Sequence, residues 1–302
     1  MTTTMLGATN HQGHQVTTRP ISDYMAVTPA MPSNPTDVDR WLGHFNLRAM
    51  PFTRAIPEDG LFPHKSFSEA LSRLSLGVHS KTPTLLTAEP GLGKSTLLGH
   101  FSDSLDKGRY RLVYTALCSC KPYGLVGQLA ARYGIKPKLT ASQTAQVMLD
   151  ELMKSGKHEI LVLDEGQRLP AESLDELRLL SNLDFDRTPP FALVLAGQPE
   201  LRSRLLEPDH DSLWQRLSIR ATLTPLSDRE TVDYIDRRMR AVGAMASVFR
   251  PGASDKIFER SQGVPRKINN LATASLLAAG AAGKKHVDVA DVENASFDQE
   301  NS

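Results

Sequence analysis

The sequence predicts an α/β fold, in which a five-stranded parallel sheet carries helices on both faces and is followed by a small all-helical domain. Three observations lead to this prediction. Short apolar runs alternate with helical patterns up to residue 223, a glycine-rich turn follows the first run, and no strand pattern appears after residue 225. Strands that are separated by helices run parallel, because each crossover helix returns the chain to the same end of the sheet.

Changes in composition divide the chain into three parts. Residues 1–38 are rich in Thr, Pro, His and Met and lack periodicity, so we expect a flexible N-terminal arm. Residues 39–225 are the expected α/β domain, including a lead-in at 39–63 whose aromatic residues we expect to pack against that domain. Residues 226–302 are the expected helical domain and a short tail.

Hydrophobic periodicity places the individual elements. The expected strands are 84–88, 111–117, 158–163, 191–197 and 218–223. The expected helices of the α/β domain are 65–78, a segment from the glycine-rich turn to about 107, 125–133, 143–154, 171–182 and 199–206. Those of the helical domain are 227–242, 252–262, 265–279 and 289–297, the first opened by a capping box of Ser227 and Glu230.

The glycine-rich turn is typical of a loop that binds the phosphates of a nucleotide. It reads Ala88-x-x-x-x-Gly93-Lys94-Ser95 between a strand and a helix, with Ala88 where a glycine is usual. Small residues let backbone N–H groups surround a phosphate chain, Lys94 reaches the β- and γ-phosphates of ATP, and Ser95 ligates Mg²⁺. The residues expected around the nucleotide are Ala88, Glu89, Pro90, Gly91, Leu92, Gly93, Lys94, Ser95 and Thr96.

A second chemical signal follows the third expected strand. Four apolar residues end in Asp164 and Glu165, and the run of apolar residues is typical of a strand that is buried on both faces. At the carboxyl end of such a strand, Asp164 would hold Mg²⁺ through water and Glu165 would polarise the water that attacks the γ-phosphate. Taken alone, the two carboxylates would only indicate the end of a strand.

Three further polar positions complete the expected catalytic site. Gln198 follows the fourth strand and would orient the attacking water, although it could instead be a turn amide with a local role. Arg216 and Arg220 flank the start of the fifth strand, and we expect one of them to act on the nucleotide of a neighbouring copy; the alternative is an ordinary surface arginine. Arg266 opens a helix of the helical domain and would reach back to the nucleotide.

Composition limits the remaining possibilities. The net charge is +1, so a surface for nucleic acid would have to be local. No apolar stretch is long enough for a membrane span, and we see no signal peptide. Cys118 and Cys120 are a poor metal site, so we expect two reduced thiols in a cytoplasmic protein.

The phosphate loop, the two carboxylates, the polar residue after the fourth strand, the arginine pair and Arg266 follow one another along the chain as they do in AAA+ ATPases. The sequence resembles that family, and more closely its ExeA-like group. The resemblance covers roughly residues 41–298. Besides the phosphate loop, it rests on His44-Phe45 with Pro51-Phe52, Leu163–Leu169, Glu176–Leu183, Leu195–Leu201 and Gly263–Arg266. It implies Mg-dependent hydrolysis of ATP by a homo-oligomer, as a ring or helical filament.

Two processes use ATPases of this kind. ExeA-like secretion proteins carry a membrane span and a cell-wall module after the ATPase, whereas TniB- and TnsC-like transposition ATPases are compact and assemble on double-stranded DNA. Because this chain ends soon after its helical domain, we expect a transposition accessory ATPase that selects target DNA and recruits a transposase or adaptor. The alternative is an ExeA-like assembly ATPase that acts on a protein partner.

If duplex DNA is bound, sequence-independent contacts to its phosphates would come from basic residues on protruding loops. Lys121, after the second strand, is the first candidate. The others are Lys136, Lys138 and Arg168. For each of them, an ordinary solvated surface residue is the alternative.

Overall fold

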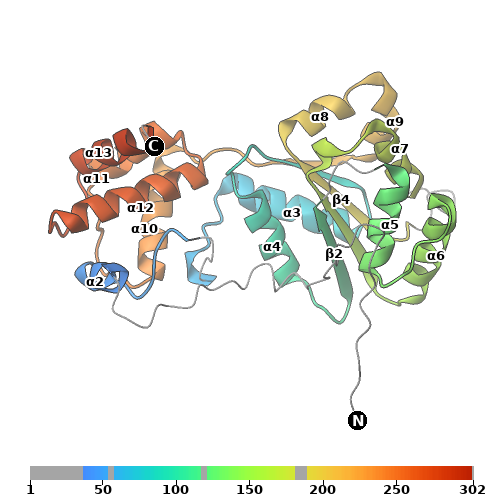
Figure 1. Cartoon of the computed structure of the whole chain (residues 1–302), viewed down its shortest axis with the longest axis horizontal. Helices are drawn as coiled ribbons and strands as arrows, with labels where there is room; N and C mark the ends of the chain where they lie inside the picture. The colour runs from blue at the N-terminus through green and yellow to red at the C-terminus, as the bar shows by residue number, and fades with distance from the viewer. Residues whose placement is uncertain (1–36, 54–57, 117–120, 181–188, 301–302) are drawn as a thin grey trace, which may run out of the picture.

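The computed structural model describes residues 37–53, 58–116, 121–180 and 189–300 (Figure 1). Most of the expected N-terminal arm, as well as Cys118 and Cys120, lies outside these residues. Among the described residues, no helix has the length and apolar character that a membrane span requires.

A five-stranded parallel sheet forms the centre of the α/β part, in the order β2-β3-β4-β1-β5. The strands are β1 (Thr84–Thr87), β2 (Tyr110–Ala116), β3 (His158–Asp164), β4 (Ala192–Gly197) and β5 (Ile219–Thr222). Every residue of β1 and β4 is buried, as expected for central strands that are covered on both faces. The carboxyl ends of the parallel strands meet at one edge, where Thr87 of β1 pairs with Gly197 of β4. The sheet confirms the predicted fold class.

Helices cover both faces of this sheet, as Figure 1 shows. One face packs on α3 (Lys65–His79) and α4 (Lys94–Ser104). The other packs on α5 (Pro122–Arg132), α6 (Ala141–Lys154), α7 (Ala171–Leu180), α8 (Pro199–Leu205) and α9 (Asp211–Arg216). Successive strand residues serve opposite faces: Leu85 contacts the second set and Leu86 the first. Short 3-10 helices are η1 (Glu58–Gly60), η2 (Gly166–Arg168) and η4 (Pro208–His210).

A second core lies in the helical part of the chain. It is built from α10 (Asp228–Ala241), α11 (Pro251–Ser261), α12 (Pro265–Ala281) and α13 (Val289–Glu300). The predicted capping box begins α10: the Ser227 hydroxyl accepts from the Glu230 N–H, and the Glu230 carboxylate accepts from the Ser227 N–H. The change from one core to the other falls between Leu223 and Leu226.

The lead-in packs where it was not expected. Its first helix, α2 (Asp37–His44), lies beside the helical part in Figure 1, and Trp41, Phe45 and Phe52 are buried in the helical core. The Trp41 indole Nε1 donates to the Leu276 carbonyl oxygen (3.1 Å). Our expectation that these aromatic residues pack against the α/β domain is therefore wrong, because an apolar pattern shows that a face is buried but not against which partner.

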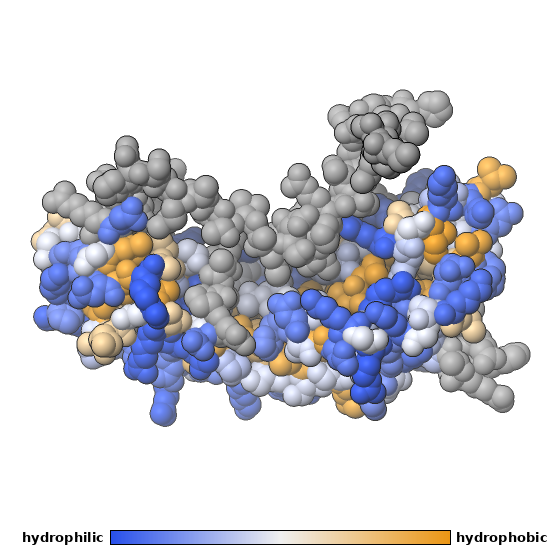
Figure 2. Space-filling model, turned by 90° about the horizontal axis from the view of Figure 1, so that it is seen from below, coloured by the Kyte–Doolittle hydropathy of each residue, from blue (hydrophilic) through white to orange (hydrophobic). Residues whose placement is uncertain are grey.

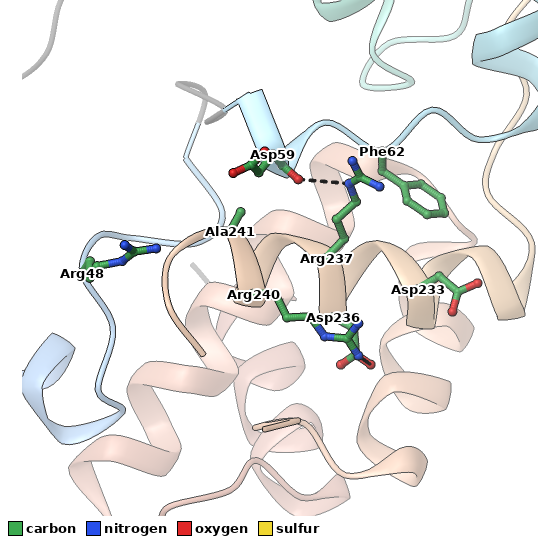
Figure 3. Close-up of a pocket in the computed structure, with 8 residues that line it drawn as sticks. All are labelled: Arg48, Asp59, Phe62, Asp233, Asp236, Arg237, Arg240 and Ala241. Atoms are coloured by element: carbon green, nitrogen blue, oxygen red, sulfur yellow. Dashed lines mark hydrogen bonds and ion pairs between the residues drawn. The ribbon is translucent and has the colours of Figure 1, made fainter. Parts of the chain in front are cut away.

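One glycine and two arginines hold the lead-in against the helical part. A Cβ atom at Gly280 of α12 would lie 2.8 Å from the Trp41 ring, so glycine makes room for the indole. The Arg238 guanidinium, which is buried, donates to the carbonyl oxygens of Pro51 (2.8 Å) and Thr53 (2.7 Å). Arg237 donates to the Asp59 carbonyl oxygen (3.0 Å) on the outside of α10 (Figure 3).

Replacing Trp41 by alanine should destabilise the helical part. The change removes a buried indole and its hydrogen bond, and a Trp→Ala change in a core typically costs about 3–5 kcal/mol. We expect the free energy of opening of α12, measured by hydrogen exchange, to fall by a similar amount. Met245→Ala, at a fully exposed side chain of the same part, is the control. Equal protection of α12 in both variants would contradict the packing described here.

Candidate nucleotide-binding site

The predicted phosphate loop joins β1 to the first turn of α4. Gly91 and Gly93 both have a φ of 94°, a left-handed conformation that residues with a side chain rarely adopt. The Ala88 N–H donates to the Gly197 carbonyl oxygen (3.1 Å), which ties the start of the loop to β4. Leu92 is buried below the loop. The glycines therefore allow a tight turn whose end is the N-terminus of a helix, a place that favours anions.

Lys94 lies against the two carboxylates that follow the buried strand. Its Nζ donates to Asp164 Oδ1 and to Glu165 Oε1, the latter at 3.2 Å. The exposed fractions are 11% for the Lys94 side chain, 3% for Asp164 and 29% for Glu165. The structure thus brings together the predicted lysine of the loop and both predicted carboxylates at the carboxyl edge of the sheet.

Asp164 has a further partner that the sequence did not reveal. The Tyr114 hydroxyl, from β2, donates to Asp164 Oδ2 (2.9 Å). Burial, and next the charge of Asp164, raise the pKa of Tyr114, so its hydroxyl stays protonated and donates. Tyr114 lies two residues before the end of β2, which pairs with β3. The only signal for it in the sequence was an aromatic residue near the end of the neighbouring strand.

Gln167 connects Glu165 to the end of β4. Its Nε2 donates to Glu165 Oε2 (2.9 Å), and its Oε1 accepts from the Gln198 N–H (3.2 Å). Glu165 itself has a φ of 60°, a left-handed conformation that is uncommon for a residue with a side chain. Arg204 of α8 donates to the Gln167 carbonyl oxygen (2.8 Å). Sequence reasoning placed Gln198 beside Asp164 and Glu165 but did not identify Gln167, which links them.

The two arginines near β5 have different surroundings. Arg220 lies 3.5 Å over the Trp214 ring, and its guanidinium donates to the carbonyl oxygens of Leu217 and Trp214 (both 2.8 Å). Arg216 is the last residue of α9, is partly exposed, and also has an interaction within the chain. The extensive contacts of Arg220 with its own chain are those of a structural arginine, which leaves Arg216 as the better candidate for acting on a neighbouring copy.

The helical part meets the phosphate loop at Arg266. Its backbone N–H donates to the Gly91 carbonyl oxygen (3.2 Å), and its side chain is exposed. A Cβ atom at Gly91 would lie 3.0 Å from Arg266 Cβ, so the two backbones approach closely. The predicted position of Arg266 next to the nucleotide loop agrees with this contact, and its role toward a nucleotide stays a prediction.

The four residues expected to contact DNA come from three segments of the chain, and their role stays a prediction. Arg168 lies in η2, where its Nε is 3.8 Å from Glu165 Oε2. Lys121 is exposed and precedes the first turn of α5. Lys136 and Lys138 lie on the loop between α5 and α6 and line one cavity. These positions bring Arg168 to the nucleotide site and the last two lysines together.

The donor set of the site fits Mg²⁺ bound with a nucleotide. Ser95 lies in the first turn of α4 and is exposed, and Asp164 ends β3 at the same edge. Mg²⁺ usually takes one or two protein oxygens and completes its shell with phosphate oxygens and water. Among the residues that the structure describes, no group of three or more His, Cys, Asp or Glu side chains could hold a metal ion.

Solved structures share this architecture. Cdc6p from Pyrobaculum aerophilum matches with a TM-score of 0.67 and 20% identity, over 82% of this chain and 70% of that chain. The ORC1 protein of Aeropyrum pernix, solved in complex with DNA, matches with a TM-score of 0.61 and 18% identity, over 84% of this chain and 69% of that chain. This likeness shows the fold, a parallel sheet covered by helices with a helical part, and nothing beyond it.

The sequence comparisons agree with this fold. Residues 78–205 match the family model of the AAA domain. The General secretion pathway protein A of Aeromonas hydrophila is 29% identical over 260 residues, which cover 84% of this chain and 47% of that protein. The chain therefore spans about half the length of this curated relative. The expected resemblance to AAA+ and ExeA-like proteins is confirmed, whereas none to the TniB and TnsC group is shown.

Gln167→Ala should slow ATP hydrolysis more than it weakens ATP binding. The variant removes the bond that orients Glu165 and leaves the phosphate loop intact, and loss of such a supporting bond typically costs on the order of tenfold or more in activity. We expect kcat to fall by about that factor and the ATP dissociation constant to change less than about threefold. Gln215→Ala, which removes an exposed amide on α9, is the control. An unchanged kcat would exclude the proposed positioning role.

Proposed function

We propose that this chain binds ATP with Mg²⁺ and hydrolyses it at the site formed by the phosphate loop and the end of β3. The observation that carries this proposal is the contact of Lys94 with both Asp164 and Glu165 beside two glycines in a left-handed conformation. A lysine, two carboxylates and a helix N-terminus at one point are the groups that phosphoryl transfer to water requires.

Each residue of the site has a role that follows from its chemistry. The N–H groups of residues 88–96 and Lys94 would bind the phosphates, and Lys94 would leave the carboxylates to do so. Ser95 and Asp164 would hold Mg²⁺, which supplies positive charge that neutralises the phosphate oxygens. Glu165, held by Gln167, would accept the proton of the attacking water. Arg266 would contact the nucleotide from the helical part, so that its binding changes the position of that part.

For the biological role, we propose an assembly ATPase of the ExeA-like kind that acts on a protein partner as a homo-oligomer. The similarity to General secretion pathway protein A over most of the chain supports this role. We therefore no longer propose target selection in transposition, because no comparison and no contact among the described residues supports that role. The likeness to the DNA-bound ORC1 protein concerns the fold alone.

Two substitutions separate binding from hydrolysis. Lys94→Ala removes a charge-assisted contact to the phosphates, worth about 1.5–3 kcal/mol, so ATP affinity should fall by about 10- to 100-fold. Glu165→Gln keeps the shape of the side chain but removes the proton acceptor, so the variant should bind ATP and hydrolyse it about 100-fold more slowly or worse. Binding is measured by calorimetry and hydrolysis by release of phosphate. Wild-type affinity in the Lys94 variant would refute the assigned site.

Arg216 can be tested by mixing variants. Arg216→Ala should bind ATP but hydrolyse it poorly, and Lys94→Ala, with its weakened affinity, should leave its own site largely empty at an ATP concentration near the wild-type dissociation constant. If Arg216 acts on a neighbouring copy, mixed oligomers contain sites with an intact Lys94 next to an intact Arg216, and activity should partly return. Co-sedimentation confirms that mixed oligomers form. Mixed oligomers without any recovery would show that Arg216 does not act across the interface.

A further inference from the structure

The Asp164 carboxylate is held by three donors among the described residues. Its Oδ1 accepts from Lys94 Nζ and from the Glu165 N–H (2.8 Å), and its Oδ2 accepts from the Tyr114 hydroxyl (2.9 Å). In the view of Figure 2, the surface of the α/β part carries hydrophilic and hydrophobic areas side by side, but the Asp164 side chain is only 3% exposed and lies beneath the surface. The two oxygens are therefore oriented by donors of the protein.

Tyr114 reaches Asp164 diagonally across two paired strands. Tyr114 of β2 is the register partner of Val162 in β3, and Asp164 lies two residues further along β3. Both side chains therefore project from the same face of the sheet, at a diagonal spacing that an aromatic side chain can span. Ala116, the register partner of Asp164, has no polar side-chain group. The side chain of β2 that holds this carboxylate is therefore that of Tyr114.

Packing holds the ring of Tyr114 in place. The ring lies on the face of the sheet that α3 and α4 cover, against a core that includes Leu98 and Phe101. A tyrosine side chain has only two rotatable bonds before its ring is fixed, so a packed ring leaves the hydroxyl little freedom. The hydroxyl is thus a fixed donor to Oδ2, and its position does not depend on Lys94.

The two oxygens of Asp164 would respond differently to a nucleotide. If Lys94 turned toward the phosphates, Oδ1 would lose a charged donor and keep the backbone N–H of Glu165. Oδ2 would keep the Tyr114 hydroxyl. One oxygen would thereby become available to a cation, while the other would stay bonded to a neutral donor.

A carboxylate that offers one oxygen suits Mg²⁺ better than Ca²⁺. Mg²⁺ demands a small, near-octahedral shell, in which it keeps several waters beside phosphate oxygens and one or two carboxylates. Ca²⁺ accepts about six to eight oxygens in a flexible shell, and these can include both oxygens of one carboxylate. A donor fixed to Oδ2 opposes this second mode of binding.

We propose that Tyr114 positions Asp164 so that the carboxylate offers a single oxygen to Mg²⁺ or to a water bound to it, and that Tyr114 thereby favours Mg²⁺ over Ca²⁺ at this site. Because Tyr114 acts through Asp164, it is a positioning residue. This inference rests on the proposed binding of ATP with Mg²⁺. The wild-type chain tests that proposal and a Tyr114 variant tests this one, so the two can fail separately.

Tyr114→Phe removes the hydroxyl and keeps the ring. Binding of a non-hydrolysable ATP analogue is measured by calorimetry with saturating Mg²⁺, with saturating Ca²⁺ and with EDTA. Loss of a hydrogen bond that orients a metal ligand typically costs about 10- to 100-fold in metal affinity, so the dissociation constant with Mg²⁺ should rise at least about tenfold. With Ca²⁺ it should rise by less than about threefold, because the freed oxygen can then contact the larger ion. With EDTA it should stay unchanged.

Tyr110→Phe is the matched control. It removes a hydroxyl from the same face of β2 at the end of the strand away from Asp164, and it should leave all three dissociation constants unchanged. Wild-type constants in the Tyr114 variant, or equal losses with Mg²⁺ and Ca²⁺, would overturn the proposed selectivity. A loss of the same size with EDTA would show that Tyr114 supports the fold of the whole site, and would overturn the positioning role too.

A second background tests whether Tyr114 acts through Asp164. In Asp164→Ala there is no carboxylate left to position, so adding Tyr114→Phe should change the affinity measured with Mg²⁺ by less than about twofold. An equal loss in the wild-type and Asp164→Ala backgrounds would show that Tyr114 acts by another route and would contradict the proposal.

Discussion

The contact of Lys94 with Asp164 and Glu165 is the interaction on which the geometry of the site depends. It joins the first residue of α4 to the end of β3 across the edge of the sheet. Bringing these charges out of water is costly unless they are paired, so the ammonium group and the carboxylates hold one another in place. A nucleotide that takes Lys94 would release both carboxylates at once, and the binding of phosphates would thereby be linked to the freeing of groups for Mg²⁺ and water.

The supporting contacts would keep these carboxylates in position if Lys94 turned toward a nucleotide. Tyr114 donates to Asp164 from one side, and Gln167 donates to Glu165 from the other. Gln167 also accepts from the backbone of Gln198, so a shift at the end of β4 would move Glu165. Arg266 adds the helical part to this set through the Gly91 carbonyl oxygen. The helical core contains residues of the lead-in, which precedes the sheet in sequence, and residues of α10 to α13, which follow it. Both segments therefore belong to the part that contacts the phosphate loop through Arg266.

The sequence was most informative where chemistry restricts the choice of residues. The loop has a left-handed backbone at positions 91 and 93, which favours glycine, and a strand that is buried on both faces favours apolar residues such as those before Asp164. Loop and strand were therefore both predictable. Long-range partners were not. Trp41 gave an apolar signal, but its partners, the Leu276 carbonyl oxygen and the space left by Gly280, lie more than 230 residues away in sequence.

Local ambiguity explains the other differences. The six residues of α9 are too few for a helical period to stand out, so the sequence predicts no helix there. Tyr114 bonds to Asp164, which is distant in sequence, and Gln167 bonds both to nearby Glu165 and to the distant Gln198 N–H. Neither set of contacts leaves a spacing that sequence reasoning can detect. The contact of the Arg220 guanidinium with the ring of Trp214, six residues earlier, also left no pattern in the sequence.

The most direct test of this account is a calorimetric titration of the nucleotide-free chain with ATP, once with Mg²⁺ and once with EDTA. If Lys94, Ser95 and Asp164 form the site, one ATP binds per chain, and it binds more tightly with Mg²⁺, because the oxygens of Ser95 and Asp164 can hold the ion only in that case. Failure to bind ATP, or an affinity that Mg²⁺ does not change, would contradict the proposed site.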